Sequence, residues 1–256
     1  MHLSMPETPL DTPAQRKADR ARWLRAFNLA FAAVLALAAI FAAQSAFDVS
    51  PWTVRPGSVA GLIGVLTAPL LHGGFDHLAS NAFGVLLLGT LAGAMYPKAL
   101  VRTLPITWLG AGLAAWLLGD AGSHHLGASG VTHGLMFLLV AQGLLRRDRP
   151  SVAAALIALL LFGGMLLTVL PREMGVSWQS HLGGAIGGAI GAIAFFRADP
   201  LAPRRRYSYE DDEDSVAALD DELESPAPAD VPVLWQRPDP HDEGGVVLQF
   251  PRRPSD

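Results

Sequence analysis

The fold is decided by residues 178–197, WQSHLGGAIGGAIGAIAFFR, which contain no Asp, Glu, Lys or Arg before Arg197. A helix needs about 20 mostly apolar residues to cross the hydrocarbon core of a bilayer, and this stretch has that length. Gly184 and Gly188 are four residues apart, and small residues at this spacing let membrane helices pack closely. The stretch therefore predicts a membrane helix packed tightly against its neighbours.

The composition of the whole chain also indicates a membrane protein. Of 256 residues, 51% are hydrophobic and only 16% are charged, whereas a soluble domain carries about a quarter charged residues. The net charge of −4 argues against nucleic-acid binding. Because the chain has no cysteine, disulfides, thiolate metal sites and cysteine nucleophiles are excluded. The first 25 residues lack the apolar core of a cleavable signal peptide.

Uncharged stretches and the basic loops between them predict six membrane spans, because Lys and Arg beside a span stay on the cytoplasmic side. The apolar stretch 56–75 is interrupted by prolines and glycines, so we interpret it as a re-entrant or interfacial segment. Both termini are then cytoplasmic, and the expected location is a bacterial inner membrane. The predicted spans are 26–47, 76–96, 101–119, 127–145, 151–170 and 178–197.

This interpretation gives an all-α polytopic membrane protein of three parts. Residues 1–25 form a basic cytoplasmic segment, and residues 26–197 form the membrane domain. Residues 198–256 are acidic and rich in proline, a composition that buries too little apolar surface to fold alone. We therefore expect this last part to be a disordered cytoplasmic tail.

Polar side chains inside spans are costly, so each one is a candidate site residue. In the predicted topology they gather at the external end of three helices, where side chains from different helices can meet at one depth. The second span begins near His72, His77 and Asn81, the fourth near Ser129 and His133, and the sixth at His181.

The types of residue in these three groups favour acyl transfer. His77 and Asn81 are one helical turn apart on one face, and both can donate hydrogen bonds. Ser129 lies in Gly127-Ala128-Ser129-Gly130, where small neighbours allow close approach, at a helix start that favours negative charge. A serine nucleophile, the base His181 and donors for an oxyanion are the minimal set. No carboxylate is placed to orient the base, so the sequence predicts a dyad.

Other interpretations of the histidines are weaker. His72 and His77 are five residues apart, about 140° around a helix, and the zinc-protease motif H-E-x-x-H is absent from the sequence. We therefore expect no metal and no cofactor. His124 and His125 lie in a glycine-rich loop and are expected to be solvated rather than catalytic.

The pattern His72-x4-His77-x3-Asn81, Gly127-Ala128-Ser129-Gly130 and His181-x2-Gly184-x3-Gly188 resembles the rhomboid family of intramembrane serine proteases. The resemblance covers residues 26–197 and implies a six-helix rhomboid-like bundle with a partly membrane-embedded first loop. It implies cleavage of transmembrane segments of other membrane proteins, with Ser129 as nucleophile and His181 as base. His77, Asn81 and the Ser129 N–H would form the oxyanion hole, and His72 would have a supporting role.

One departure from the family pattern concerns the residue four after the serine, which is often an aromatic residue that packs on the base. This chain has His133 there, and we expect it to stack on His181 or bond to it. The alternative to a protease is a catalytically silent rhomboid-like adaptor or chaperone that binds transmembrane segments. A transporter or metal-binding protein is a third hypothesis, in which Ser129 would be dispensable.

Overall fold

The structure is a computed structural model that describes residues 13–172 and 175–200, and these residues are mostly helical, which confirms the predicted all-α class. Residues 1–12 and the acidic segment from residue 201 onward lie outside the described residues. The helices are α1 (Pro13–Ala43), α2 (Gly64–Thr67), α3 (Phe75–Met95), α4 (Pro97–Leu118), α5 (Ser129–Arg146), α6 (Arg149–Phe162) and α7 (Trp178–Phe195).

Four helical segments in the described part are long and apolar enough to cross a membrane. Helices α5 and α7 fall outside this set, because each carries a histidine and several glycines that lower its hydropathy. The number of six spans therefore stays a prediction. The four segments are Pro13–Ala46, Phe75–Met95, Pro97–Leu118 and Arg149–Leu166.

Two helices differ most in length from the predicted spans. Helix α1 begins at Pro13, 13 residues before the expected start at residue 26, because proline suits the first position of a helix and the basic residues after it continue the helical turns. Helix α6 ends at Phe162 and a short 3-10 turn, Gly163–Leu166, follows it. Two successive glycines disfavour a continuing helix, so the predicted span 151–170 is too long as an α-helix.

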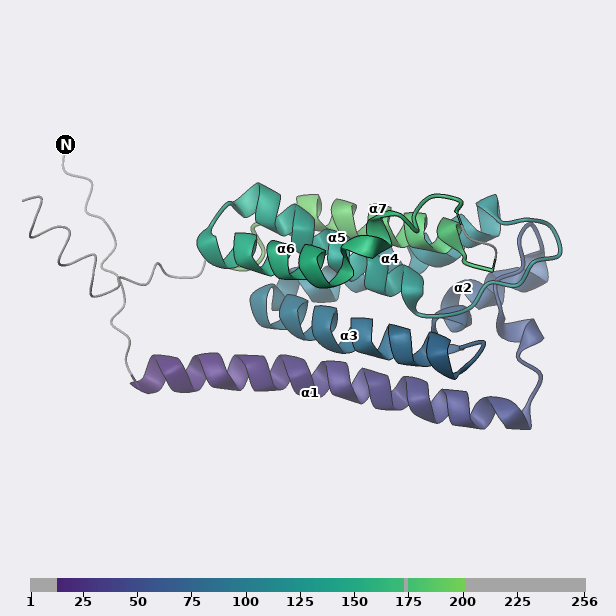
Figure 1. Cartoon of the computed structure of the whole chain (residues 1–256), viewed down its shortest axis with the longest axis horizontal. Coiled ribbons are helices and arrows are strands. Elements are labelled where there is room, and N and C mark those ends of the chain that lie inside the picture. The colour runs from purple at the N-terminus through teal and green to yellow at the C-terminus, as the bar shows by residue number, and fades with distance from the viewer. Residues whose placement is uncertain (1–12, 173–174, 201–256) are drawn as a thin grey trace, which may run out of the picture. The chain divides into compact units, whose positions relative to one another are not determined.

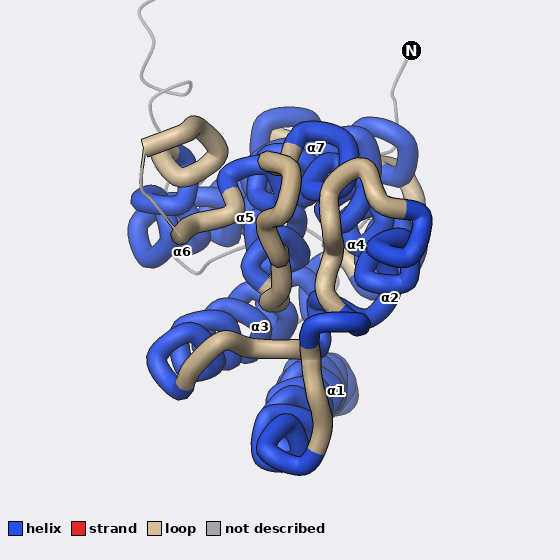
Figure 2. The backbone as a smooth tube through the Cα atoms, turned by 90° about the vertical axis from the view of Figure 1, so that its right-hand side faces the viewer, coloured by secondary structure: helices blue, strands red, loops and turns tan. Residues whose placement is uncertain are grey.

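Helix α7 packs most extensively on α4 and α5, and Figure 2 shows these three helices as neighbours on the side of the bundle away from α1. Two rows of glycine on α7 make this packing possible, because a Cβ at each position would meet the neighbouring helix. One row contacts α4 and consists of Gly183, Gly187 and Gly191. The other row contacts α5 and consists of Gly184 and Gly188.

Residues 44–74 form an excursion of short helical turns between α1 and α3, and α2 lies within it (Figure 1). Val54 and His125 exchange two backbone hydrogen bonds of 2.9 and 3.0 Å, and the Gly127 N–H donates to the Ala68 carbonyl at 2.8 Å. The segment 56–75 is therefore no single spanning helix. Through these backbone hydrogen bonds the excursion holds the loop that immediately precedes α5 in place.

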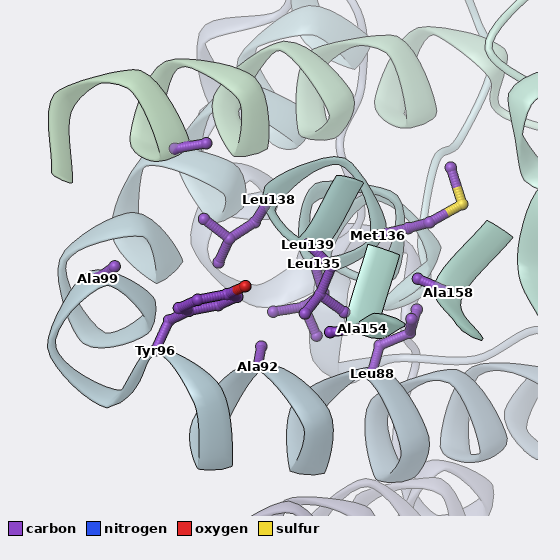
Figure 3. Packing of buried hydrophobic residues seen from close by; sticks show 11 residues of the cluster. Leu88, Ala92, Tyr96, Ala99, Leu135, Met136, Leu138, Leu139, Ala154 and Ala158 are labelled. Carbon is purple, nitrogen blue, oxygen red and sulfur yellow. The ribbon is translucent and has the colours of Figure 1, made fainter. Parts of the chain in front are cut away.

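The main apolar core lies between α3, α4, α5, α6 and α7 (Figure 3). Leu138, Leu139 and Met136 of α5 have no exposed surface, and Tyr96 at the corner between α3 and α4 is equally buried. The carboxylate of Asp199, just after α7, accepts from the first N–H groups of α4, Lys98 and Ala99, at 3.1 and 2.9 Å. This cap fixes the chain after α7 to the start of α4.

Candidate active site

Ser129 and His181 are in direct contact. Ser129 is the first residue of α5 and His181 lies in the first turn of α7, and their helices meet through Gly130 and Gly184. The Ser129 Oγ lies 2.9 Å from the His181 Nε2, and His181 is only 6% exposed. The two side chains that the sequence predicts as a dyad are thus within hydrogen-bond distance.

The other ring nitrogen of His181 defines the direction of this bond. Its Nδ1 lies 3.0 Å from the backbone carbonyl oxygen of Thr168, which can only accept. The Nδ1 therefore carries the hydrogen in the neutral ring, and the Nε2 accepts the hydrogen of the Ser129 hydroxyl. Thr168 lies in the turns after α6, which ends at Phe162. No motif in the sequence pointed to this residue.

His133 stacks on His181, with ring centroids 3.9 Å apart and an angle of 14° between the ring planes. Of the two predicted contacts, stacking or a hydrogen bond, the structure has the stacking. His133 makes its hydrogen bonds to residues other than His181. Its Nδ1 donates to the Ser129 carbonyl at 2.7 Å, and its Nε2 lies 2.8 Å from the Thr168 hydroxyl. His133 thus contacts both members of the dyad.

His77 and Asn81 border the backbone just before Ser129. Gly127 has φ of 116°, and a Cβ there would lie 2.5 Å from the His77 Nε2 and 3.4 Å from the Asn81 Nδ2. Glycine is needed for both reasons, since other residues rarely adopt this φ. The Asn81 Nδ2 is buried and has no hydrogen-bond partner, which leaves a donor available. Their roles as oxyanion donors stay predictions.

His72 lies behind His77 rather than beside Ser129. Its ring meets the His77 ring edge-on, with centroids 5.2 Å apart, and both of its ring nitrogens are buried without a hydrogen-bond partner. The Gln44 side chain holds the His72 backbone by two bonds, accepting from its N–H at 3.0 Å and donating to its carbonyl at 2.8 Å. Gln44 is a second residue that sequence reasoning did not identify.

A cavity of about 1320 Å³ reaches the dyad. Ser129, His181, His77 and Asn81 all contribute to its lining, together with residues of the loops before α5 and α7. Side chains from α3, α5 and α7 therefore meet in one hollow, as the polar clusters in the sequence predict. A substrate in this cavity would have access to the serine hydroxyl.

The expectation that His124 and His125 are both solvated is wrong for His125. His124 is exposed, but His125 is 9% exposed, and its ring bonds to Ser123 at 2.9 Å and to Ser177, the cap of α7, at 2.7 Å. Burial lowers the pKa of His125. This ring therefore connects the loop before α5 to the start of α7.

Within residues 13–172 and 175–200, no three His, Cys, Asp or Glu side chains gather as metal ligands would. His72 and His77 are near each other, but no third ligand of these types joins them in that part of the chain.

Comparison with known proteins identifies the fold. Residues 59–198 match the rhomboid domain. The chain is 35% identical over 191 residues to the uncharacterized protein Rv1337 of Mycobacterium tuberculosis, a match that covers 71% of this chain and 80% of the relative. It is 31% identical over 201 residues to the uncharacterized protein ML1171 of Mycobacterium leprae, covering 74% and 80% respectively. Because the matched domain spans more than half of the chain, this chain belongs to the rhomboid family.

Proposed function

We propose that the chain is an intramembrane serine endopeptidase that hydrolyses peptide bonds in or near transmembrane segments of other membrane proteins. The observation that carries the proposal is the 2.9 Å contact between the Ser129 Oγ and the His181 Nε2. The rhomboid family includes serine proteases, and membership in it supports the same conclusion. The cavity at the dyad supplies room for an extended stretch of substrate.

The chemistry follows from the direction of the hydrogen bonds. His181 takes the proton of the Ser129 hydroxyl at Nε2 as the oxygen attacks the scissile carbonyl. The negative charge on the carbonyl oxygen is stabilised by the Asn81 amide, His77 and the Ser129 N–H. The Ser129 N–H belongs to the first residue of α5 and has no partner one turn earlier. His181 then protonates the leaving amine, and water hydrolyses the acyl-enzyme by the reverse proton path.

We further infer a six-span topology in a bacterial plasma membrane with both termini in the cytoplasm. Four apolar helices of spanning length support a membrane location, and the bacterial origin of the relatives supports a plasma membrane. Large apolar side chains face outward on the helices, for example Leu29 at 68% and Leu160 at 85% exposure. In water such surfaces are unfavourable, whereas lipid chains solvate them.

The test is cleavage in proteoliposomes. A panel of single-span proteins with fluorescent tags at both ends is incubated with wild-type protein and with the Ser129→Ala variant. The proposal expects two tagged fragments from at least one substrate with the wild type and none with the variant. Binding of a substrate by both proteins at equal affinity, with no fragment from either, would instead favour the silent adaptor.

A further inference from the structure

We propose that Thr168 and His133 are positioning residues that orient His181, in the role that the acid has in a Ser-His-Asp triad. The inference rests on the proposed function, because it gives these residues a part in serine chemistry. It concerns two residues that bond to the dyad and to each other, of which Thr168 lies in the turns after α6.

The geometric basis is a closed ring of four hydrogen bonds. The Ser129 Oγ contacts the His181 Nε2 at 2.9 Å, and the His181 Nδ1 contacts the Thr168 carbonyl at 3.0 Å. The Thr168 Oγ1 contacts the His133 Nε2 at 2.8 Å, and the His133 Nδ1 contacts the Ser129 carbonyl at 2.7 Å. The ring begins and ends on the nucleophile, so Thr168 connects to Ser129 through either histidine.

The imidazole protons and the serine proton each have a determined place when both histidines are neutral. The two Nδ1 atoms face carbonyl oxygens, which only accept, so both carry hydrogen. Both Nε2 atoms are then acceptors. Ser129 donates its hydroxyl hydrogen to His181, and Thr168 donates its own to His133. The Thr168 hydroxyl also lies 3.0 Å from the Met165 carbonyl, but its single hydrogen serves one acceptor at a time.

The ring of hydrogen bonds restrains the His181 imidazole in two ways. The Thr168 carbonyl fixes the rotation of the His181 ring within its plane and selects the tautomer that can accept from serine. His133 covers one face of the ring at 3.9 Å, and it is itself held at both nitrogens. A backbone carbonyl also favours the imidazolium that forms during attack, as a carboxylate does in a triad.

The local sequence explains why Thr168 can reach this position. Helix α6 ends at Phe162, and residues 163–170 follow it as a 3-10 turn and further turns. In a continuing α-helix the Thr168 carbonyl would accept from an N–H four residues later. Outside the helix it is free to accept from His181.

The experiment measures the rate of covalent labelling of Ser129 by a tagged fluorophosphonate. Thr168→Val removes the hydroxyl and keeps the side-chain shape, and Thr168→Ser restores the hydroxyl. His133→Phe keeps an aromatic ring on His181 and removes both hydrogen bonds. Thr90→Val is the matched control, because the Thr90 hydroxyl bonds within α3 to the Leu86 carbonyl.

We expect Thr168→Val and His133→Phe each to slow labelling by about 10- to 100-fold, because small misplacements of reacting groups are costly. Thr168→Ser should recover most of the rate, and Thr90→Val should match the wild type. The double variant Thr168→Val/His133→Phe should be no slower than the slower single variant, because both break the same link. Multiplied losses in the double variant, or equal losses with Thr168→Ser, would overturn the inference.

A spectroscopic measurement separates this inference from the proposed function. Nitrogen-15 spectra of histidine-labelled protein should show His181 as a single Nδ1–H tautomer in the wild type and also in Thr168→Val, because that variant keeps the backbone carbonyl that faces Nδ1. If the wild type shows this tautomer but is not labelled, the proposed protease activity is contradicted and the hydrogen-bond ring still stands. If the wild type is labelled but His181 shows a mixture of tautomers, the protease activity still stands and the hydrogen-bond ring is contradicted.

Discussion

Replacing Gly184 with alanine should separate the two halves of the dyad. A Cβ at Gly184 would overlap the backbone carbonyl of Gly130 and lie 3.1 Å from its Cα. The obstacle is backbone in the middle of a helix contact, so no side-chain rotation can relieve it. Because Gly130 directly follows Ser129, and Gly184 is three residues after His181, any separation of α5 and α7 here moves the serine away from its base.

The size of the effect follows from this geometry. Making room for the methyl group requires the helices to separate by about 1 Å, which costs about 1–3 kcal/mol of stability. The Ser129–His181 distance, 2.9 Å in the structure, would then exceed the range of a hydrogen bond. A displacement of this size at reacting groups lowers the rate on the order of 10²-fold.

The assay compares fluorophosphonate labelling rates and thermal unfolding in detergent for three glycine-to-alanine variants. At Gly89, within α3, a Cβ would meet only the Ala30 Cβ at 3.4 Å, which is an ordinary van der Waals contact, so Gly89→Ala should resemble the wild type. Gly191→Ala clashes with Thr103 of α4 near the far end of α7, so it should lower stability and spare most of the labelling. Equal labelling rates in Gly184→Ala and Gly89→Ala would refute the reasoning.

Two further predictions concern residues near the dyad. Asn81→Ala should lower the cleavage rate about 10²–10³-fold with little change in KM, because one oxyanion donor is lost; an unchanged rate would exclude that role. Burial holds the pKa of His125 below its usual 6.5, so its contribution to stability is complete above about pH 6.5 and declines as the pH falls. His125→Gln should therefore lose less thermal stability between pH 7 and pH 5 than the wild type, and an identical decline would contradict this linkage.

The broad architecture was predictable because hydropathy and charge act along the chain. Residues 178–197 have the length of a span and the glycine spacing of a packed helix, and α7 occupies Trp178–Phe195. The start of α1 was not predictable from hydropathy, because polar helical turns before a span leave no apolar signal. The end of α6 at Phe162 depends on two glycines whose effect in a membrane helix varies with its neighbours.

The candidate site was predictable to the extent that its residues are polar within apolar sequence. Ser129 and His181 stand out for this reason, and the structure brings them together. Thr168 and Gln44 do not stand out, because both act largely through backbone groups: Thr168 offers its own carbonyl, and Gln44 holds the backbone of His72. His125 was misjudged because loop composition does not reveal that its ring is enclosed by Ser123 and Ser177.

The most direct test of the central claim is covalent labelling of the purified protein by a tagged fluorophosphonate. Wild type, Ser129→Ala and His181→Ala are compared at equal concentration, with folding checked by thermal unfolding. An activated serine predicts labelling of the wild type and none of either variant. Labelling that persists in Ser129→Ala, or no labelling of a folded wild type beside an active control enzyme, would contradict the claim that Ser129 and His181 form a catalytic dyad.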